Sequence, residues 1–218
     1  IIPGFGLLND RFKNPVLNLW KYNKINPVNS LFSNFAKVPL KPFIGTIGLA
    51  PKKKGLHSVV PPRNCGGNLD IKEIHVGSKL FLPVQVEGGL LSLGDTHAAQ
   101  GDGEVCGTAI ESPMKVLIKI TLHKNYSLES PFIETNQKEK NANLNINGSF
   151  ITTGIGEDLF ISSREAVMRM IDYLVQNFKI KDTEAYMLCS VAGNLKISEI
   201  VDMPNWVVSF QIPKSIFI

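Results

Sequence analysis

The sequence predicts an α+β fold, with a β-rich core like a sandwich or barrel and a smaller α+β portion near the C-terminus. The first 60 residues or so, punctuated by prolines, are expected to be irregular with short strands, and a β pattern follows over residues 79–122. The clearest helical periodicity comes late, over residues 163–178, and neither an internal repeat nor a Gly/Ser linker divides the chain. We therefore expect a β-rich segment over residues 1–122 and an α+β segment with two helices and closing strands over residues 123–218. The two could form one continuous domain.

Composition excludes several classes of protein. The chain has 218 residues, of which 44% are hydrophobic and 19% charged, so it can bury a core and is neither a disordered tail, a coiled coil nor a collagen-like chain. The net charge is +4, and Lys52–Lys54 is the tightest basic cluster, which argues against nucleic-acid binding. No apolar run reaches the about 18 residues of a membrane span, and residues 1–8 do not resemble a signal peptide. Three scattered cysteines fit neither a disulfide framework nor a CxxC zinc site, so we expect a cytoplasmic protein.

The β-rich segment contains three predicted strands or strand regions. Residues 43–49 form one because β-branched residues lie there between prolines, while Gly45 and Gly48 indicate a bulge or a close backbone approach. Residues 80–86 alternate at period two. Residues 115–122 place four apolar side chains on one face, which predicts a strand with its other face only partly solvated.

The α+β segment begins with a polar stretch, residues 124–148, predicted to be a long hairpin tip or loop. A strand is expected over residues 150–155. A helix follows over residues 163–178, where Ser162 and Glu165 fit a capping box and an apolar stripe repeats at helical spacing. Further elements are predicted after it: a helix over 183–191 capped by Asp182 and ended by Gly193, and strands over 195–201 and 206–212.

Residues with chemical potential concentrate between positions 64 and 111. Asp95 and His97 are two residues apart, so on an extended strand they share a face and could chelate one metal ion; the alternative is a turn Asp beside an ordinary His. Gln100, Asp102 and Glu104 follow in a glycine-rich loop. They could provide a carboxylate that activates water beside a metal, or form a solvated hairpin turn.

Two other stretches leave their interpretation open. The loop of residues 64–70 could line a polar pocket with Gly67, Asn68 and Asp70, or be a plain turn. The pair Glu73 and His75 also shares a strand face, but no glycine-rich acidic loop adjoins it.

Three single residues need a separate interpretation. Glu111 either extends the acidic group along the chain or points to water. Cys106 is expected to be a small buried side chain. Cys65, in the polar loop, is the more reactive candidate of the two.

Taken in order, these motifs resemble the acetamidase/formamidase family. The most specific stretch is residues 94–104, Gly-Asp-Thr-His-Ala-Ala-Gln-Gly-Asp-Gly-Glu, followed by Gly-Thr-Ala-Ile-Glu at 107–111. Weaker matches are the stretches at residues 43–51, 64–70, 77–84 and 198–205.

The resemblance implies hydrolysis of small aliphatic amides such as formamide or acetamide, a β-rich fold with a smaller α+β part, and homo-oligomers. It also makes a divalent metal, zinc or calcium, an expected cofactor. Family members are longer and begin with a β-rich segment that this sequence does not contain. An inactive family member that acts as a binding or structural protein is therefore the alternative.

The mechanism we hypothesise is metal-assisted amide hydrolysis. Asp95 and His97 would ligate the ion, with Asp70 as third ligand, and bound water would become acidic. The catalytic set is Glu104, Asp102 and Gln100, with Glu104 as the general base and acid, and Asn68 and Gly67 contribute substrate binding. A second mechanism uses Cys65 or Cys106 as the nucleophile of an acyl-enzyme.

Overall fold

The computed structural model describes residues 1–23, 25, 28–33, 35–136, 138–141 and 144–218. The strands are β1 (Asn29–Phe32), β2 (Ala36–Pro39), β3 (Phe43–Gly48), β4 (Gly66–Asn68), β5 (Lys79–Phe81), β6 (Ser92–His97), β7 (Phe132–Glu134), β8 (Lys138–Asn141), β9 (Leu144–Asn147), β10 (Ser149–Gly156), β11 (Asn194–Glu199) and β12 (Trp206–Pro213). The helices are α1 (Leu159–Phe178) and α2 (Asp182–Ala192), and a 3-10 turn, Lys214–Ile216, follows β12.

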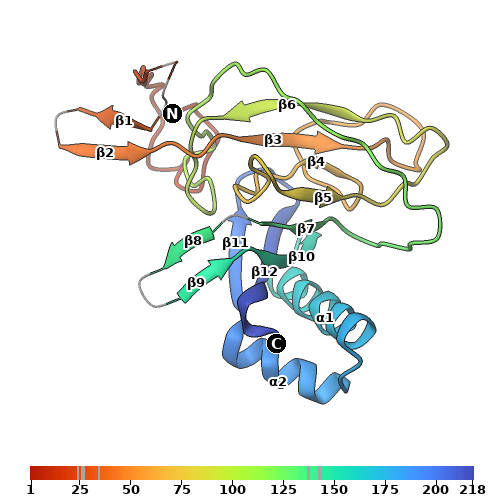
Figure 1. The fold of residues 1–218 in the computed structure, drawn as a ribbon. Coiled ribbons are helices and arrows are strands. Elements are labelled where there is room, and N and C mark those ends of the chain that lie inside the picture. The colour runs from red at the N-terminus through yellow and green to blue at the C-terminus, as the bar shows by residue number, and fades with distance from the viewer. Residues whose placement is uncertain (24, 26–27, 34, 137, 142–143) are drawn as a thin grey trace.

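Two antiparallel sheets form the body of the molecule (Figure 1). One has five strands in the order β11-β12-β10-β7-β5, and the other has three in the order β4-β3-β6. Strands β1 and β2 form a separate hairpin, as do β8 and β9. The predicted α+β class is confirmed. The larger sheet takes β5 from residues 1–122 and its other four strands from residues 123–218, so it joins the two predicted segments.

The five-stranded sheet is covered on both faces. Helices α1 and α2 pack on one face and bury Met170, Leu174 and Cys189 against Val208 and Phe210 of β12. On the other face, a cluster of isoleucines with Leu69 and Val207 lies between this sheet and β3 of the smaller sheet. In Figure 1 the helices accordingly lie at the opposite end of the molecule from β3, β4 and β6. The five-stranded sheet is therefore the middle of three layers, with the helices on one face and the smaller sheet on the other.

Helix α1 confirms the predicted apolar stripe but not its predicted start. The helix begins at Leu159, and its N-cap is Asp158, whose side chain accepts a hydrogen bond from the Ile161 amide. The predicted capping box is wrong because Ser162 lies buried inside the helix and Glu165 instead pairs with Arg169 one turn later. Any Ser, Thr, Asp or Asn can cap a helix, and the sequence offered both Asp158 and Ser162. Helix α2 begins at Asp182 itself and ends before Gly193, one residue beyond the predicted range at each end.

The predicted strand over residues 115–122 is wrong. The chain there has no regular secondary structure, and its side chains are exposed, with Leu117 at 99% and Ile120 at 73% exposure. Alternating β-branched residues favour a strand only when a neighbouring strand pairs with them, and no described strand lies alongside. Where Gly45 and Gly48 suggested a close backbone approach, β3 does run against β4, and a Cβ built on Gly48 would lie 2.3 Å from the Gly67 nitrogen.

The remaining elements follow the predicted order, but the strand predicted over residues 80–86 is shorter: β5 ends at Phe81, before Pro83, which has no amide hydrogen to donate. Residues 124–148 contain the short strand β7 and the hairpin of β8 and β9, although residues 137, 142 and 143 lie outside the described residues. The predicted strands 150–155, 195–201 and 206–212 correspond to β10, β11 and β12. Within the described chain, neither helix has the length and apolarity to cross a bilayer.

A buried ion pair fastens the turn after Leu69 to the larger sheet. The Lys196 ammonium of β11 bonds the Glu73 carboxylate, and the side chains are 19% and 5% exposed. Glu73→Ala would leave the ammonium without its counter-charge, so we expect a loss of about 3–5 kcal/mol in the free energy of unfolding, measured by urea titration. The matched control is Glu165→Ala, which breaks a more exposed pair within one helix and should cost about 0.5 kcal/mol. Equal losses in the two variants would contradict this role.

Candidate active site

Six ionisable side chains from distant parts of the chain meet in one place, which we call the acid–imidazole cluster: Asp70, Asp95, His97, Glu104, Glu111 and Asp202. They form three overlapping groups, Asp70–Asp95–His97, His97–Glu104–Glu111 and Asp70–Glu104–Asp202. Within each group the potential ligand atoms lie within 4.8 Å of one another. Each group could hold a metal ion.

The smaller sheet places the imidazole. His97 ends β6 and pairs with Phe43 of β3, whose ring meets the imidazole edge to face with centroids 5.1 Å apart. An isolated bridge pairs His97 with Glu111 on the other side, which brings the Glu111 carboxylate to 3.2 Å from His97 Nε2. Of the two interpretations left open for Glu111, the structure shows the one in which it joins the acidic group.

The absence of a side chain at Gly45 lets the cluster form. A Cβ at this position of β3 would lie 2.5 Å from Asp70 Oδ1, 2.8 Å from the Asp95 carbonyl oxygen and 2.9 Å from His97 Cε1. All three distances are shorter than real Cβ contacts. The hydrogen atom of glycine is therefore required for Asp70 and His97 to approach each other over β3.

Three acids of the cluster have a strained backbone. Asp70, Asp95 and Glu104 have φ angles of 46°, 50° and 45°, and they are half of the six non-glycine residues with positive φ in the described chain. Non-glycine residues rarely adopt this left-handed backbone conformation, and residues that do are enriched at functional sites. The surrounding turns thus aim three carboxylates at one point at a cost in conformational energy.

Gln100 fixes the orientation of the imidazole. Its side-chain oxygen lies 2.8 Å from His97 Nδ1, while its amide nitrogen donates to the Asp70 carbonyl at 2.7 Å. An amide oxygen only accepts, so Nδ1 carries a proton and Nε2 faces the Asp95 and Glu111 carboxylates, at 3.2 Å from each. This arrangement resembles the outer hydrogen bond that orients metal-binding histidines.

A second chain of hydrogen bonds connects the far edge of the cluster. The Thr46 hydroxyl lies 2.6 Å from Asn68 Oδ1 and 3.1 Å from Asp95 Oδ2. Asn68 in turn donates its amide to Asp202 Oδ2 at 2.7 Å. Thr46 and Asn68 thereby join Asp95 of β6 to Asp202, which lies in the turn between β11 and β12.

Burial and crowding of like charge shift the pKa values of the acids. Burial, reinforced by the Glu104 charge, raises the pKa of Asp70 to about 10. Burial also raises the pKa of Glu104 to about 8, with Asp202 and Glu111 adding to the effect.

The other members of the cluster respond to the imidazole. A hydrogen bond to His97 lowers the pKa of Asp95. Burial alone would lower the pKa of His97, but the hydrogen bonds that its ring donates to Asp95 and Glu111, together with the Asp70 charge, raise it to about 11. The cluster thus contains five carboxyl groups and only one imidazole, so it has too few cationic groups to balance its acids.

Two predicted site residues lie outside the hydrogen-bonded centre. The Asp102 carboxylate forms a salt bridge with Lys72 at 2.7 Å, and both side chains are about one-third exposed. Gly67 has a φ of 108°, which favours glycine, and a Cβ built there would meet open space. The open space at Gly67 adjoins Asn68, the next residue in the chain.

Sequence reasoning missed Thr46 and Asp202 as site residues. Thr46 lies in the strand predicted over residues 43–49, and that prediction used only the glycines and the β-branched character of the stretch. Asp202 lies more than 90 residues after Glu111, and the match of residues 198–205 to the family was the signal that could have found it.

The cysteines take no part in the cluster. Cys65 is 3% exposed, and burial raises the pKa of its thiol. Cys106 is exposed, so the prediction that it is buried is wrong; its thiol lies 3.3 Å from the Thr108 carbonyl oxygen. A raised thiol pKa weakens Cys65 as a nucleophile.

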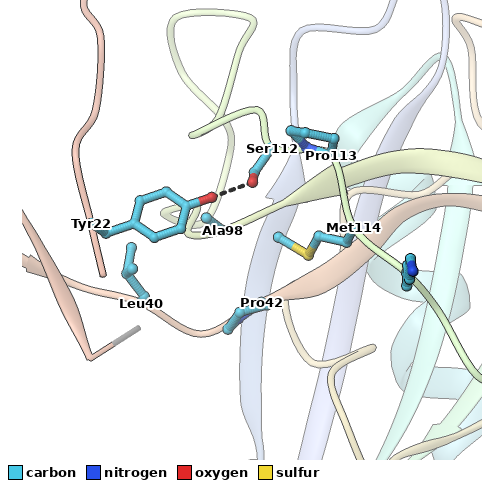
Figure 2. Close-up of a pocket in the computed structure, with 8 residues that line it drawn as sticks. Tyr22, Leu40, Pro42, Ala98, Ser112, Pro113 and Met114 are labelled. Carbon is cyan, nitrogen blue, oxygen red and sulfur yellow. Dashed lines mark hydrogen bonds between the residues drawn. The ribbon is translucent and has the colours of Figure 1, made fainter. Parts of the chain in front are cut away.

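A mostly apolar pocket lies beside the start of β3 and the end of β6 (Figure 2) and is separate from the acid–imidazole cluster. Its lining contains none of the six ionisable residues, although Pro42, Ala98 and Ser112 each adjoin Phe43, His97 or Glu111 in sequence. Tyr22 closes one side by a hydrogen bond to Ser112.

Comparison with known proteins identifies the family. A model described as the Acetamidase/Formamidase family matches residues 53–218, which include the whole acid–imidazole cluster. The chain belongs to the acetamidase/formamidase family. The formamidase of Methylophilus methylotrophus is 35% identical over 174 residues, which cover 72% of this chain and 41% of that protein.

Solved structures of the acetamidase/formamidase family share the fold. The acetamidase of Bacillus halodurans has a TM-score of 0.81 at 32% identity and covers 99% of this chain, which spans 68% of that one. The acetamidase of Yersinia enterocolitica has a TM-score of 0.82 at 32% identity, and this chain spans 63% of it. The chain thus spans less than half the length of the curated formamidase and about two thirds of these acetamidases.

Proposed function

We propose that this chain hydrolyses small aliphatic amides, such as formamide and acetamide, to the carboxylic acid and ammonia. Its acid–imidazole cluster would be the catalytic centre. The observation that carries the proposal is the buried His97, held by Gln100 on one side and by Asp95 and Glu111 on the other. Membership of the acetamidase/formamidase family supports the choice of substrate class.

The cluster has the properties of a divalent-cation site. Asp70 Oδ1 is buried and has no hydrogen-bond partner among the described residues, although a carboxylate oxygen buried without a partner is costly. Carboxylates with one imidazole are ligands that suit zinc, and oxygen-rich sets suit calcium. We propose that Asp95, His97 and Asp70 hold such an ion, which would supply Lewis-acid polarisation of the amide carbonyl.

Glu104 is the proposed proton carrier. It is 7% exposed and belongs to two of the three groups, so its carboxylate faces both His97 and Asp70. In the proposed reaction it takes a proton from the attacking water and returns it to the nitrogen as the carbon–nitrogen bond breaks, which releases neutral ammonia. Burial and the nearby Asp202 and Glu111 raise the pKa of Glu104 to about 8, close to neutrality, which suits a group that both takes and returns a proton.

The amide groups have different proposed roles. Gln100 has both ends of its side chain bonded to His97 and Asp70, so it orients the imidazole rather than the substrate. Asn68 is also bonded at both ends, to Thr46 and Asp202. Its second amide hydrogen, beside the open space at Gly67, is the group proposed for substrate binding. Asp102 stays in the proposal as a residue that places the loop before Glu104 through its salt bridge to Lys72.

Ammonia release from formamide and from acetamide tests the proposal. We expect release from at least one of them that rises linearly with protein concentration. Folded protein with no release from either amide would favour the alternative, an inactive family member with a binding or structural role.

Cys65→Ala and Cys106→Ala should both retain activity, and loss in either would favour the acyl-enzyme mechanism. Light scattering on the same sample tests the homo-oligomer that the family resemblance implies.

A further inference from the structure

Glu199 is a buried acid that the proposed chemistry does not use. It ends β11, and its side chain has 0% exposure. A register shift between Ile197 and Glu199 interrupts the pairing of β11 with β12. Such a bulge re-aims a side chain that would otherwise follow the regular alternation of a strand.

The Glu199 side chain holds the turn that carries Asp202. Its Oε1 accepts hydrogen bonds from the backbone amides of Val201 and Asp202, the latter at 2.6 Å. Asp202 is the cluster member that receives the Asn68 amide and lies within ligand distance of Asp70 and Glu104. One carboxylate oxygen therefore fixes the backbone from which Asp202 reaches the cluster.

The backbone around Glu199 also holds the loop that carries Glu104. Gly103 donates its amide to the Ser198 carbonyl at 2.9 Å and forms a parallel bridge with Glu199. Glu104 is the next residue after Gly103. The end of β11 thus contacts two of the three chain segments that supply the group Asp70–Glu104–Asp202.

The buried carboxylate of Glu199 has an incomplete set of hydrogen bonds. Glu199 Oε2 has no hydrogen-bond partner among the described residues. An apolar side chain would avoid this cost if the position served only packing. We therefore expect Glu199 to have a role that depends on a carboxylate oxygen at the end of a side chain of this length.

We propose that Glu199 is a positioning residue, which sets Asp202 and the Glu104 loop at the distances that the acid–imidazole cluster requires. The inference rests on the proposed amidase function. Glu199 acts through the backbone amides of residues 201 and 202 and contacts neither substrate nor the imidazole. What matters is an acceptor oxygen at the reach of a glutamate, not the negative charge.

Three substitutions separate acceptor geometry from charge and from packing. Glu199→Gln keeps an oxygen at the same reach and removes the charge, whereas Glu199→Asp keeps the charge and shortens the reach by one methylene. Glu199→Ala removes both. We expect kcat for ammonia release, per folded protein, within about threefold of wild type for Gln, and about 10–100-fold lower for Asp and Ala. If Glu199→Ala does not fold, the Gln and Asp variants still decide the question.

Hydrogen exchange at the amides of Val201 and Asp202 gives a readout that does not need activity. These amides should be protected in wild type and in Glu199→Gln, and should exchange at least about tenfold faster in Glu199→Asp. The inference would be overturned if these amides exchanged at wild-type rates in all variants, or if Glu199→Gln exchanged as fast and turned over as slowly as Glu199→Asp. If wild-type protein releases no ammonia, the proposed function fails, and the exchange pattern alone decides whether Glu199 holds the turn.

Discussion

Glu104→Gln is expected to lower kcat for formamide or acetamide hydrolysis by about 10²–10⁴-fold, the usual contribution of one general acid–base group. The amide of Gln has nearly the shape of the carboxylate but cannot take a proton. Glu104 is buried beside Asp70, Asp202 and His97, so its replacement removes a charge from a crowded acidic site. We therefore expect the variant to fold at least as stably as wild type. Ammonia release and thermal unfolding of the same sample measure both effects.

The matched control is Glu87→Gln, which makes the same chemical change at an exposed position before the Gly88–Gly89 turn. It should leave kcat unchanged. Asp102→Asn belongs in the same series because this carboxylate pairs with Lys72 outside the cluster, and we expect less than about tenfold loss. Near-normal turnover of Glu104→Gln, or a loss in Asp102→Asn as large as in Glu104→Gln, would remove Glu104 from its proposed role.

Gly45→Ala is expected to lower kcat by about 10²-fold, although the residue bears no functional group. The added methyl would lie 2.5 Å from Asp70 Oδ1 and 2.9 Å from His97 Cε1, so Asp70, His97 or the strand must move. A displacement of about 1 Å in a catalytic group can cost that factor in rate. Overpacking should also lower the free energy of unfolding by about 1–3 kcal/mol.

Gly101→Ala is the comparison for this variant. Gly101 lies between Gln100 and Asp102 in the same glycine-rich region, but a Cβ built there would meet no atom within 4 Å. It should retain turnover within about threefold of wild type, measured by ammonia release at saturating formamide. If Gly45→Ala were as active as Gly101→Ala, the close approach of Asp70 and His97 over β3 would not matter for the reaction.

Much of the fold could be predicted where local pattern and tertiary contacts agree. The apolar stripe of α1 faces β12, so its 3.6-residue period was informative. Residues 115–122 show why the same reasoning fails elsewhere. Their alternation is as regular as that of any strand here, yet strand formation depends on a neighbour that sequence periodicity does not describe. The start of α1 was misplaced because two capping side chains stand four residues apart.

The local half of the candidate site could also be predicted. Asp95 and His97 were predicted to share a face of an extended strand, and Asp95 Oδ1 does lie 3.2 Å from His97 Nε2. Asp95 has a φ of 50°, however, so the alternation of a regular strand does not by itself account for this distance. Spacing could not give the rest, since Asp202 reaches the cluster only through the turn after β11. Spacing could not show either that Gln100 bonds the Asp70 carbonyl, which lies 30 residues away in sequence.

Removal of the proposed metal ion tests the central claim most directly. Purified protein would be stripped with a chelator, its metal content measured, and ammonia release from formamide followed before and after addition of zinc or calcium. We predict that activity falls in step with metal content and returns with one of the two ions. Full turnover by protein that contains no divalent metal would contradict the account.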